Sequence, residues 1–212
     1  TLFRSLGTAA DYLEYLGTSD MTPEQLKSEF YRLACSFTVS PGSERTYVVL
    51  SGLNENMQAA MTLFEKLLSD AQVNKEAYAN MVKDVLKSRK DAKLNQSQNF
   101  NRLVSYITYG PKSPATNILS EDELNRMDPK LLVDRIHQLN SFKHRILYYG
   151  PTKEAELISV INKTHKTPKI LKDIPKGSEF PMLKTTDTKI YLAPYEAKQI
   201  YMSQLSNNGE KF

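Results

Sequence analysis

Apolar positions change their spacing twice in the first third of the chain. Leu26, Phe30 and Leu33 recur three or four positions apart, which is the spacing of one face of a helix. Residues 36–51 are instead rich in β-branched and aromatic side chains on both sides of a Pro-Gly pair, which predicts a β-hairpin. Helical spacing returns over residues 54–69. The pattern therefore predicts a helix, a hairpin and a second helix, in that order.

Local signals mark where the predicted helices begin. Thr22 can cap a helix, Pro23 suits its first position, and Gln25 can complete a capping box. Similar signals and helical spacing predict further helices over residues 74–93 and 97–109, and helices that begin near residues 120, 128 and 152, with Asn74 and Thr152 as caps. Helices are therefore the most numerous elements.

The C-terminal part of the chain differs from the rest in composition and in the periodicity of its apolar residues. Residues 145–149 predict a strand, which is ended by Gly150. Residues 166–181 are rich in Lys and Pro and lack periodicity, as is typical of a linker. Residues 188–193 and 199–205 each predict a strand. We therefore predict three parts: an α/β domain over residues 1–165, a linker over 166–187, and the opening strands of a following domain over 188–212.

These elements predict an α+β fold in which an antiparallel sheet is covered by helices mainly on one face. The chain begins with Thr1 rather than Met, and helix-like sequence is under way by Ala9. We therefore expect that natural N-terminal sequence has been removed, including strands of this sheet. Because a sheet that lacks strands exposes an edge and apolar surface, we also expect the fragment to self-associate.

Composition and charge narrow the function only a little. The 212 residues are 40% hydrophobic and 25% charged, which is ordinary for a globular protein. The net charge of +4 and the pI of about 8.9 are mild. Basic residues in the helix predicted over residues 74–93 alternate with acidic ones, as on a solvated helix face. A basic nucleic-acid-binding domain is therefore only a remote alternative.

Residue counts exclude several kinds of site. The eight glycines never lie closer than ten positions, which excludes the glycine-rich loops that cradle phosphates. Cys35 is the single cysteine, so it cannot form an internal disulfide, and we predict that it is a small buried residue. The three histidines, His137, His144 and His165, lack the i, i+4 spacing that puts two imidazoles on one metal ion, so we predict surface or hydrogen-bonded roles.

Residues 10–18 carry a more specific pattern. They read Ala-Asp-Tyr-Leu-Glu-Tyr-Leu-Gly-Thr, which resembles the metal helix of the pitrilysin/insulinase family of zinc peptidases, the inverzincins. In that family an H-x-x-E-H helix is followed shortly by Gly-Thr. The resemblance continues in order along the chain to about residue 165, through a hairpin that ends in Ser-Gly-Leu-Asn-Glu-Asn and a segment that ends in Tyr-Tyr-Gly-Pro. Residues 188–205 resemble the opening strands of the next repeat of the family.

The resemblance places the motif on Asp11, Glu14 and Tyr15. In the family, two imidazoles hold Zn²⁺ and the glutamate takes a proton from the bound water. Here Glu14 matches the glutamate that acts as the base, whereas Asp11 and Tyr15 stand in place of the two histidines. The neutral phenol of a tyrosine is a poor zinc ligand. We therefore predict a degenerate motif with no metal, cofactor or catalytic role. Tyr12, Leu13 and Tyr15 are then expected to be core residues on a helix that Gly17 ends.

The third zinc ligand of the family comes from a later helix. It falls on Lys83 or Asp84, depending on the register, and the same predicted helix also offers Glu76. A cation at the ligand position would repel a metal ion. The sequence therefore provides no complete set of residues for metal catalysis in this fragment.

Members of this family are built from homologous repeats in two halves that close around a peptide, and only one half carries zinc. The resemblance implies that this chain is a non-catalytic domain of a larger zinc metallopeptidase, with the zinc-bearing half of the same parent chain and a peptide substrate as partners. We expect no membrane span, because no apolar stretch approaches the roughly 20 residues that one requires, and the interleaved charges give no reason to expect a nucleic-acid partner. The alternative is a non-catalytic subunit or peptide-binding module of a processing-peptidase-like assembly. The residues indicate no compartment, and only family habit suggests the periplasm.

Overall fold

The computed structural model describes residues 2–42, 45–196 and 198–209. The chain divides into two compact units that interleave along the sequence. The first comprises Thr1–Ala79 and Arg126–Gly177, and the second comprises Asn80–Asn125 and Ser178–Phe212. The described elements are helices and a two-stranded antiparallel sheet, which confirms the expected α+β class. The domain boundaries near residues 165 and 187 stay predictions.

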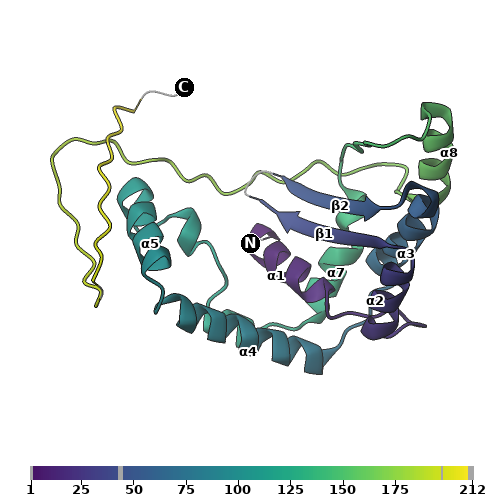
Figure 1. Ribbon diagram of the computed structural model, residues 1–212, viewed down its shortest axis with the longest axis horizontal. Helices are drawn as coiled ribbons and strands as arrows, with labels where there is room; N and C mark the ends of the chain where they lie inside the picture. Colours follow the sequence, from purple (N-terminus) through teal and green to yellow (C-terminus); the bar gives the residue numbers. More distant parts are fainter. Residues whose placement is uncertain (1, 43–44, 197, 210–212) are drawn as a thin grey trace. The chain divides into compact units, whose positions relative to one another are not determined.

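The first unit contains the hairpin and the helices packed on it (Figure 1). Its elements in chain order are α1 (Leu2–Leu13), α2 (Pro23–Arg32), β1 (Cys35–Pro41), β2 (Thr46–Gly52), the 3-10 turn η1 (Asn54–Asn56), α3 (Met57–Asp70), the start of α4 (Lys75–Ala92), α7 (Lys130–His137), the 3-10 turn η3 (Leu139–Ser141) and α8 (Glu154–Thr164).

Aromatic packing holds the helices on one face of the hairpin. Phe37 of β1 lies opposite Leu50 of β2, and burial alternates along β1 so that Phe37 points inward. Its ring packs against Phe30 of α2, with centroids 5.0 Å apart, and against Phe64 of α3, at 4.9 Å. The helices therefore lie on the Phe37 side, as the sequence predicted.

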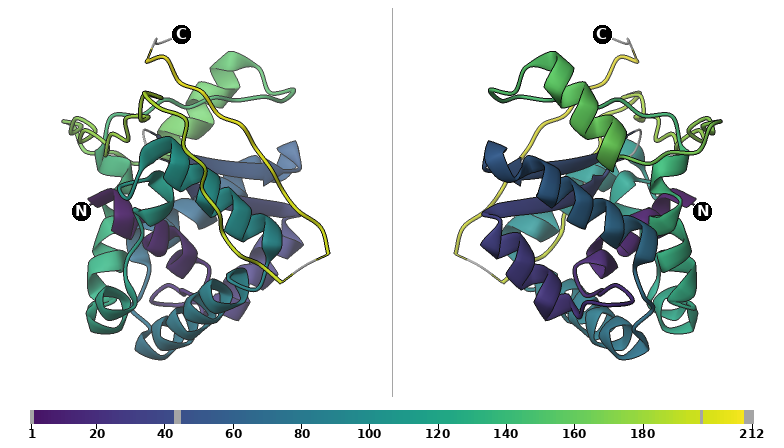
Figure 2. Two further views of the ribbon diagram at one scale, coloured as in Figure 1. Left: turned by 90° about the vertical axis from the view of Figure 1, so that its left-hand side faces the viewer. Right: turned by 90° about the vertical axis from the view of Figure 1, so that its right-hand side faces the viewer.

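A second part of the same core lies between α1 and α7. These two helices pack against each other although they come from the two separate sequence segments of the first unit (Figure 2). Tyr12 and Leu13 from α1, and Leu132 and Ile136 from α7, are among the most completely buried large side chains. The fold of this unit therefore depends on contacts between distant segments.

Local capping signals were read correctly at three helices. Gln25 N–H donates to Thr22 Oγ1 over 3.3 Å, and Thr22 N–H donates to Gln25 Oε1 over 2.8 Å, which confirms the capping box of α2. Asn74 Oδ1 accepts from Ala77 N–H over 3.0 Å. Ser120 and Glu123 form the reciprocal bonds of a second capping box at α6 (Glu121–Arg126).

The second unit is built around two helices and an extended C-terminal segment. It contains most of α4, α5 (Gln96–Tyr109), the 3-10 turn η2 (Pro114–Thr116) and α6 (Glu121–Arg126), which ends at the unit boundary. The extended segment lies along α5, where Leu183 N–H donates to Thr108 O over 2.8 Å and Tyr201 packs on Phe100 with ring centroids 5.4 Å apart.

Three predicted strands are wrong. The structure has no strand over residues 145–149, 188–193 or 199–205. A strand requires a neighbour whose backbone groups pair with its own along a continuous ladder. The extended C-terminal segment shows an isolated backbone bond, from Thr185 N–H to Asn207 O at 2.8 Å, rather than a ladder. The apolar residues of these segments suit a strand, but no neighbouring strand pairs with them in the described residues.

Two smaller predictions are also corrected. The N-cap of α8 is Lys153 rather than Thr152, because the Thr152 hydroxyl donates to Asn54 Oδ1 over 2.7 Å instead. Cys35 is half-buried rather than buried, and its thiol donates to Leu33 O over 3.2 Å. In both cases a neighbour that sequence spacing does not reveal decides the environment of the side chain.

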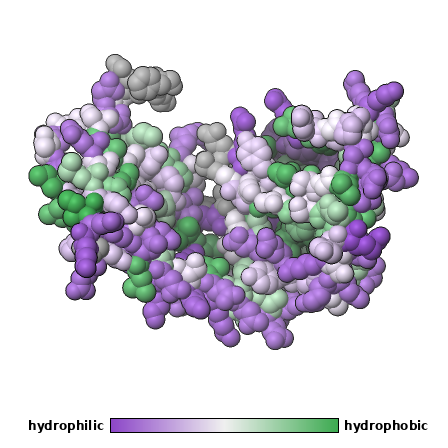
Figure 3. Space-filling model, viewed as in Figure 1, coloured by the Kyte–Doolittle hydropathy of each residue, from purple (hydrophilic) through white to green (hydrophobic). Residues whose placement is uncertain are grey.

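Apolar side chains are exposed along the extended segment of the second unit. Ile190, Leu192, Ile200 and Met202 are all exposed. Figure 3 shows apolar surface over this unit on the face drawn. Alternating exposed aliphatic residues are the expected surface of a segment that packs on α5 by one side only, as Tyr191 does on Tyr106 with ring centroids 6.1 Å apart. None of the described helices combines the length and the apolar character needed to cross a bilayer.

Candidate functional site

The degenerate motif lies where α1 ends. Asp11 belongs to the last turn of the helix, which ends at Leu13 rather than running on toward Gly17. Tyr15 N–H donates to Tyr12 O over 3.0 Å, and Leu16 N–H donates to Leu13 O over 3.2 Å, so the next residues form a tight turn. Because a helix must continue from position i to i+4 to place two side chains on one face, the backbone here departs from that geometry.

The residues beside the motif are structural. Tyr12 is buried, and its hydroxyl both donates to Asn74 O over 2.7 Å and accepts from Asn74 N–H over 3.0 Å. Its ring meets Tyr78 edge to face, with centroids 5.5 Å apart. Tyr12 and Leu13 are core residues as predicted. Tyr15 is 37% exposed, so its predicted place in the core is wrong.

The loop that follows α1 is held to the end of α3. Gln72 N–H donates to Gly17 O over 2.9 Å. Asp70 Oδ2 accepts from the Ser19 hydroxyl over 2.6 Å and from the Ser19 N–H over 2.9 Å, and these bonds lower the pKa of the Asp70 carboxyl. A hydrogen bond from Lys66 and another from Thr18 likewise lower the pKa of Asp20. The carboxylates of this loop are thus stabilised as anions.

Asp11 shows the opposite shift. Desolvation by neighbouring protein atoms, and then the charge of Glu14, raise the pKa of the Asp11 carboxyl although the residue is exposed. The charge of Glu14 therefore acts on Asp11 as a neighbouring like charge. An anion pair of this kind can attract a cation, but it lacks the imidazoles on which zinc peptidases rely.

The raised pKa of Asp11 gives a stability prediction. A carboxyl that holds its proton more tightly in the folded chain destabilises the fold once it ionises, so stability is lost as pH rises from below about 3.9 through the folded pKa. Asp11→Asn should therefore raise the free energy of unfolding at neutral pH by about 0.5 kcal/mol, a value kept small by solvent screening. Urea unfolding at several pH values measures the gain, which should vanish at low pH.

Asp20→Asn is the matched control for this experiment. The folded pKa of Asp20 is lowered, so its contribution to stability is present at neutral pH and is lost as pH falls through the folded pKa. Its substitution should therefore destabilise the chain at neutral pH. If both variants shifted stability in the same direction, the account of Asp11 would be wrong.

The three candidates for a third ligand are spread over both units. Glu76 lies in the first unit, whereas Lys83 and Asp84 lie in the second, and all three are exposed. Among the described residues, no group of three or more His, Cys, Asp and Glu side chains is placed to hold a metal ion. The degenerate nature of the motif at Asp11, Glu14 and Tyr15 stays a prediction about chemistry.

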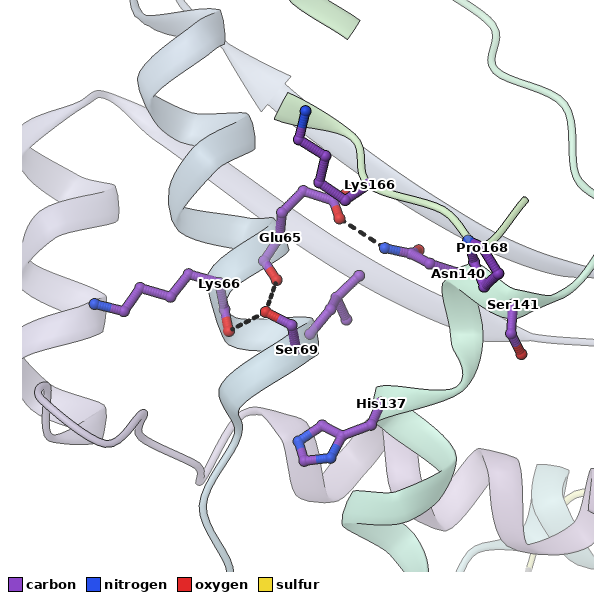
Figure 4. A pocket seen from close by; sticks show the side chains of 9 residues that line it. Glu65, Lys66, Ser69, His137, Asn140, Ser141, Lys166 and Pro168 are labelled. Carbon is purple, nitrogen blue, oxygen red and sulfur yellow. Dashed lines mark hydrogen bonds between the residues drawn. The ribbon is translucent and has the colours of Figure 1, made fainter. Parts of the chain in front are cut away.

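A small pocket lies between α3, α7, η3 and the segment after α8 (Figure 4). Its volume is about 220 Å³, below the roughly 300–1,000 Å³ of pockets that bury small ligands. Asn140 Nδ2 donates to Glu65 Oε2 over 2.6 Å, and the Ser69 hydroxyl donates to Glu65 O over 2.8 Å. Because its polar lining is largely paired within the protein, the pocket suits a single side chain better than a cofactor.

Sequence reasoning missed the residues that this region brings together. Glu65 was placed on a predicted helix without a role, and His144 and His165 were treated as separate. The structure joins all three, with Glu65 Oε1 2.5 Å from His165 Nδ1 and the two histidine Nε2 atoms 2.9 Å apart. Their separation in sequence follows no local period, so spacing gave no signal for this cluster. His165 does lie at the C-terminal end of α8, as predicted.

The fold is similar to that of solved protease structures. The structure of the ferredoxin protease FusC in complex with Arabidopsis ferredoxin matches with a TM-score of 0.63 and 10% identity, over 84% of this chain and 20% of that one. The periplasmic protease PqqL from Escherichia coli matches with a TM-score of 0.63 and 13% identity, over 88% and 21%. A protease from Helicobacter pylori matches with a TM-score of 0.60 and 12% identity, over 87% and 45%.

These likenesses concern the fold alone because the identities are low. No family model and no curated protein sequence matches the chain. The chain spans about a fifth of the length of the first two proteases and less than half of the third. A protease-like fold is therefore shown, and the activity of a longer protein is a separate question.

Proposed function

We propose that this chain is a non-catalytic, peptidase-like domain of a larger zinc metallopeptidase, in which it forms part of a peptide-binding chamber opposite a zinc-bearing half. The main support is the pairing of a protease-like fold with a motif, at Asp11, Glu14 and Tyr15, that lacks both imidazoles. Imidazole nitrogen is the usual zinc ligand of such peptidases. The end of α1 at Leu13 adds a backbone reason, since Tyr15 lies beyond the helix.

The domain would act in the chamber by shape and by positioning. A wall that approaches a peptide closely excludes large folded substrates and limits the conformations of a bound peptide, which supports catalysis by the opposite half through orientation. The parent would then be the enzyme, and this chain would bind peptide without cutting it. The same features are compatible with a separate non-catalytic subunit. A parent sequence with an intact H-x-x-E-H segment before this chain would favour the single-chain arrangement.

A cleavage assay tests the absence of catalysis. The chain, supplied with Zn²⁺ and incubated with an unstructured fluorogenic peptide, should give no turnover above the protein-free rate, because Glu14 has no metal-bound water to activate. Glu14→Gln should behave identically, and mass spectrometry should recover the peptide intact. Turnover that a chelator abolishes and Glu14→Gln removes would overturn the proposal.

A reconstitution experiment tests the chamber role directly. A zinc-bearing half expressed separately should cleave peptides faster when this chain is added, because the peptide would then be bound and oriented by both halves of the chamber. An equal concentration of an unrelated protein of similar charge is the control. No change in kcat/KM on addition would argue against the chamber and for the separate-subunit alternative.

A further inference from the structure

A pair of histidines in the first unit faces nitrogen to nitrogen. His144 lies in the segment after η3, and His165 follows α8. Their Nε2 atoms are 2.9 Å apart and the ring planes meet at 89°. His144 is exposed, whereas the His165 side chain is only 14% exposed. One ring is thus fixed within the protein and the other is open to solvent.

The other nitrogen of each ring is held by an oxygen acceptor. His144 Nδ1 donates to Phe142 O over 2.7 Å, and a carbonyl oxygen can only accept. His165 Nδ1 lies 2.5 Å from Glu65 Oε1, and an ionised carboxylate likewise only accepts. Asn140 Nδ2 donates to Glu65 Oε2 over 2.6 Å and fixes the carboxylate. Both Nδ1 atoms therefore carry hydrogen, so both Nε2 atoms present lone pairs when the rings are neutral.

Two lone pairs that face each other at this distance repel unless a cation lies between them. Metal-binding histidines typically have this arrangement, with one ring nitrogen free for the metal and the other donating to a carboxylate or a backbone carbonyl. Tetrahedral Zn²⁺ with Zn–N bonds of about 2.0–2.1 Å separates two nitrogens by about 3.3 Å. The rings would need to part by only about 0.4 Å, and exposed His144 has room to move.

We propose that His144 and His165 bind a divalent transition-metal ion of the zinc class through their Nε2 atoms, with Glu65 as a positioning residue. The two imidazoles supply two of four ligands, and water or a group from outside the chain supplies the others. The site is separate from the motif at Asp11, Glu14 and Tyr15. The inference does not rest on the proposed function, which concerns catalysis and peptide binding.

Charges around the pair are compatible with a cation. Glu65 contributes a carboxylate whose side chain is only 16% exposed, so its charge acts at short range through little solvent. Lys166 follows His165, but its ammonium donates to Asn162 O over 3.0 Å (Figure 4 shows it pointing away from Glu65). Lys143 is paired with Asp173 at 2.6 Å. Lys143 and Lys166 are thus engaged elsewhere, and the half-buried Glu65 carboxylate favours metal binding.

Zinc titration of the tag-free chain above neutral pH tests the site. The wild-type chain should bind one Zn²⁺ at least about tenfold more tightly than His144→Asn or His165→Asn. Glu65→Gln should weaken binding by about tenfold, because the carboxylate that orients His165 is lost. His137→Asn is the matched control: the His137 imidazole contacts Ala71 O at 3.2 Å and is not one of the proposed ligands, so this variant should bind like wild type.

Cu²⁺ binding provides an independent measurement of how many imidazole nitrogens bind the metal ion. Cu²⁺ prefers imidazole nitrogen, and its electron paramagnetic resonance spectrum should show coupling to two nitrogens in the wild-type chain and to fewer in His144→Asn. Exposed His144 lies outside regular structure, so this variant should stay folded, and circular dichroism checks that it does. Equal zinc affinity in the wild-type chain, His144→Asn and His165→Asn would overturn the proposal. The contact between the two rings would then be an ordinary hydrogen bond. These metal-binding measurements do not involve peptide cleavage. Neither result therefore bears on the proposed function, which the cleavage and reconstitution experiments test separately.

Discussion

Replacing Leu132 with Ala should lower the free energy of unfolding of this chain by about 2–5 kcal/mol. Leu132 lies on α7 and has no exposed surface, and it belongs to the core that α7 forms with α1. Removing most of its side chain forfeits the transfer free energy of the buried methyl groups and leaves a cavity that close-packed neighbours fill only partly. The loss is large because a domain of this size is stabilised by only about 5–15 kcal/mol in total.

Leu131→Ala is the control that isolates burial from the chemical change. Leu131 is the adjacent residue on the same helix and is 53% exposed. The two substitutions remove the same atoms and change helix propensity equally, so their difference reports the packing of Leu132. Urea unfolding monitored by circular dichroism measures both. Similar losses for the two variants would contradict the placement of α7 against α1.

Replacing Gly17 with Ala should cost about 1–3 kcal/mol, the usual range for overpacking a tight site. A Cβ atom at Gly17 would overlap the backbone oxygen of Met21 and would lie 3.2 Å from the Pro23 ring. A backbone atom cannot move aside as a flexible side chain can. The loop that joins α1 to α2 and holds Asp70 and Gln72 would therefore have to shift.

Gly7→Ala gives the opposite expectation for the same chemical change. Gly7 lies within α1, and a Cβ atom there would meet no heavy atom within 4 Å. Alanine in a helix interior is favoured over glycine by about 0.5–1 kcal/mol, so this variant should be more stable than wild type. Thermal unfolding of both variants measures the contrast. A stabilised Gly17→Ala variant would show that the loop is not as tight as the structure indicates.

Sequence reasoning was most successful where a signal is local. The capping box of Thr22 and Gln25 and the cap at Asn74 lie within three residues of the groups they bind, so their chemistry is visible in the sequence. The helical spacing of Leu26, Phe30 and Leu33 also identified a buried face correctly. These features depend on the order of residues alone.

Sequence reasoning failed where the structure of a segment depends on residues that are distant in sequence. Residues 188–193 resemble a strand in sequence, yet a strand forms only when another pairs with it. Tyr15 was expected in the core because α1 was expected to continue, whereas the helix ends at Leu13. The contacts of His144 with His165, and of His165 with Glu65, join three segments that are far apart in sequence. No spacing rule covers such a contact.

The interleaving of the two units has a consequence for synthesis on the ribosome. α1 leaves the exit tunnel before the other elements of the first unit, but its partner α7 is made only after the whole intervening stretch, from residue 14 to residue 129, has been translated. At about 5–20 residues per second, this delay is about 6–25 s. During that time the apolar face of α1 lacks its native cover and is open to chaperones and to neighbouring nascent chains. The order of translation, as well as the final contacts, therefore sets how safely this chain reaches its fold.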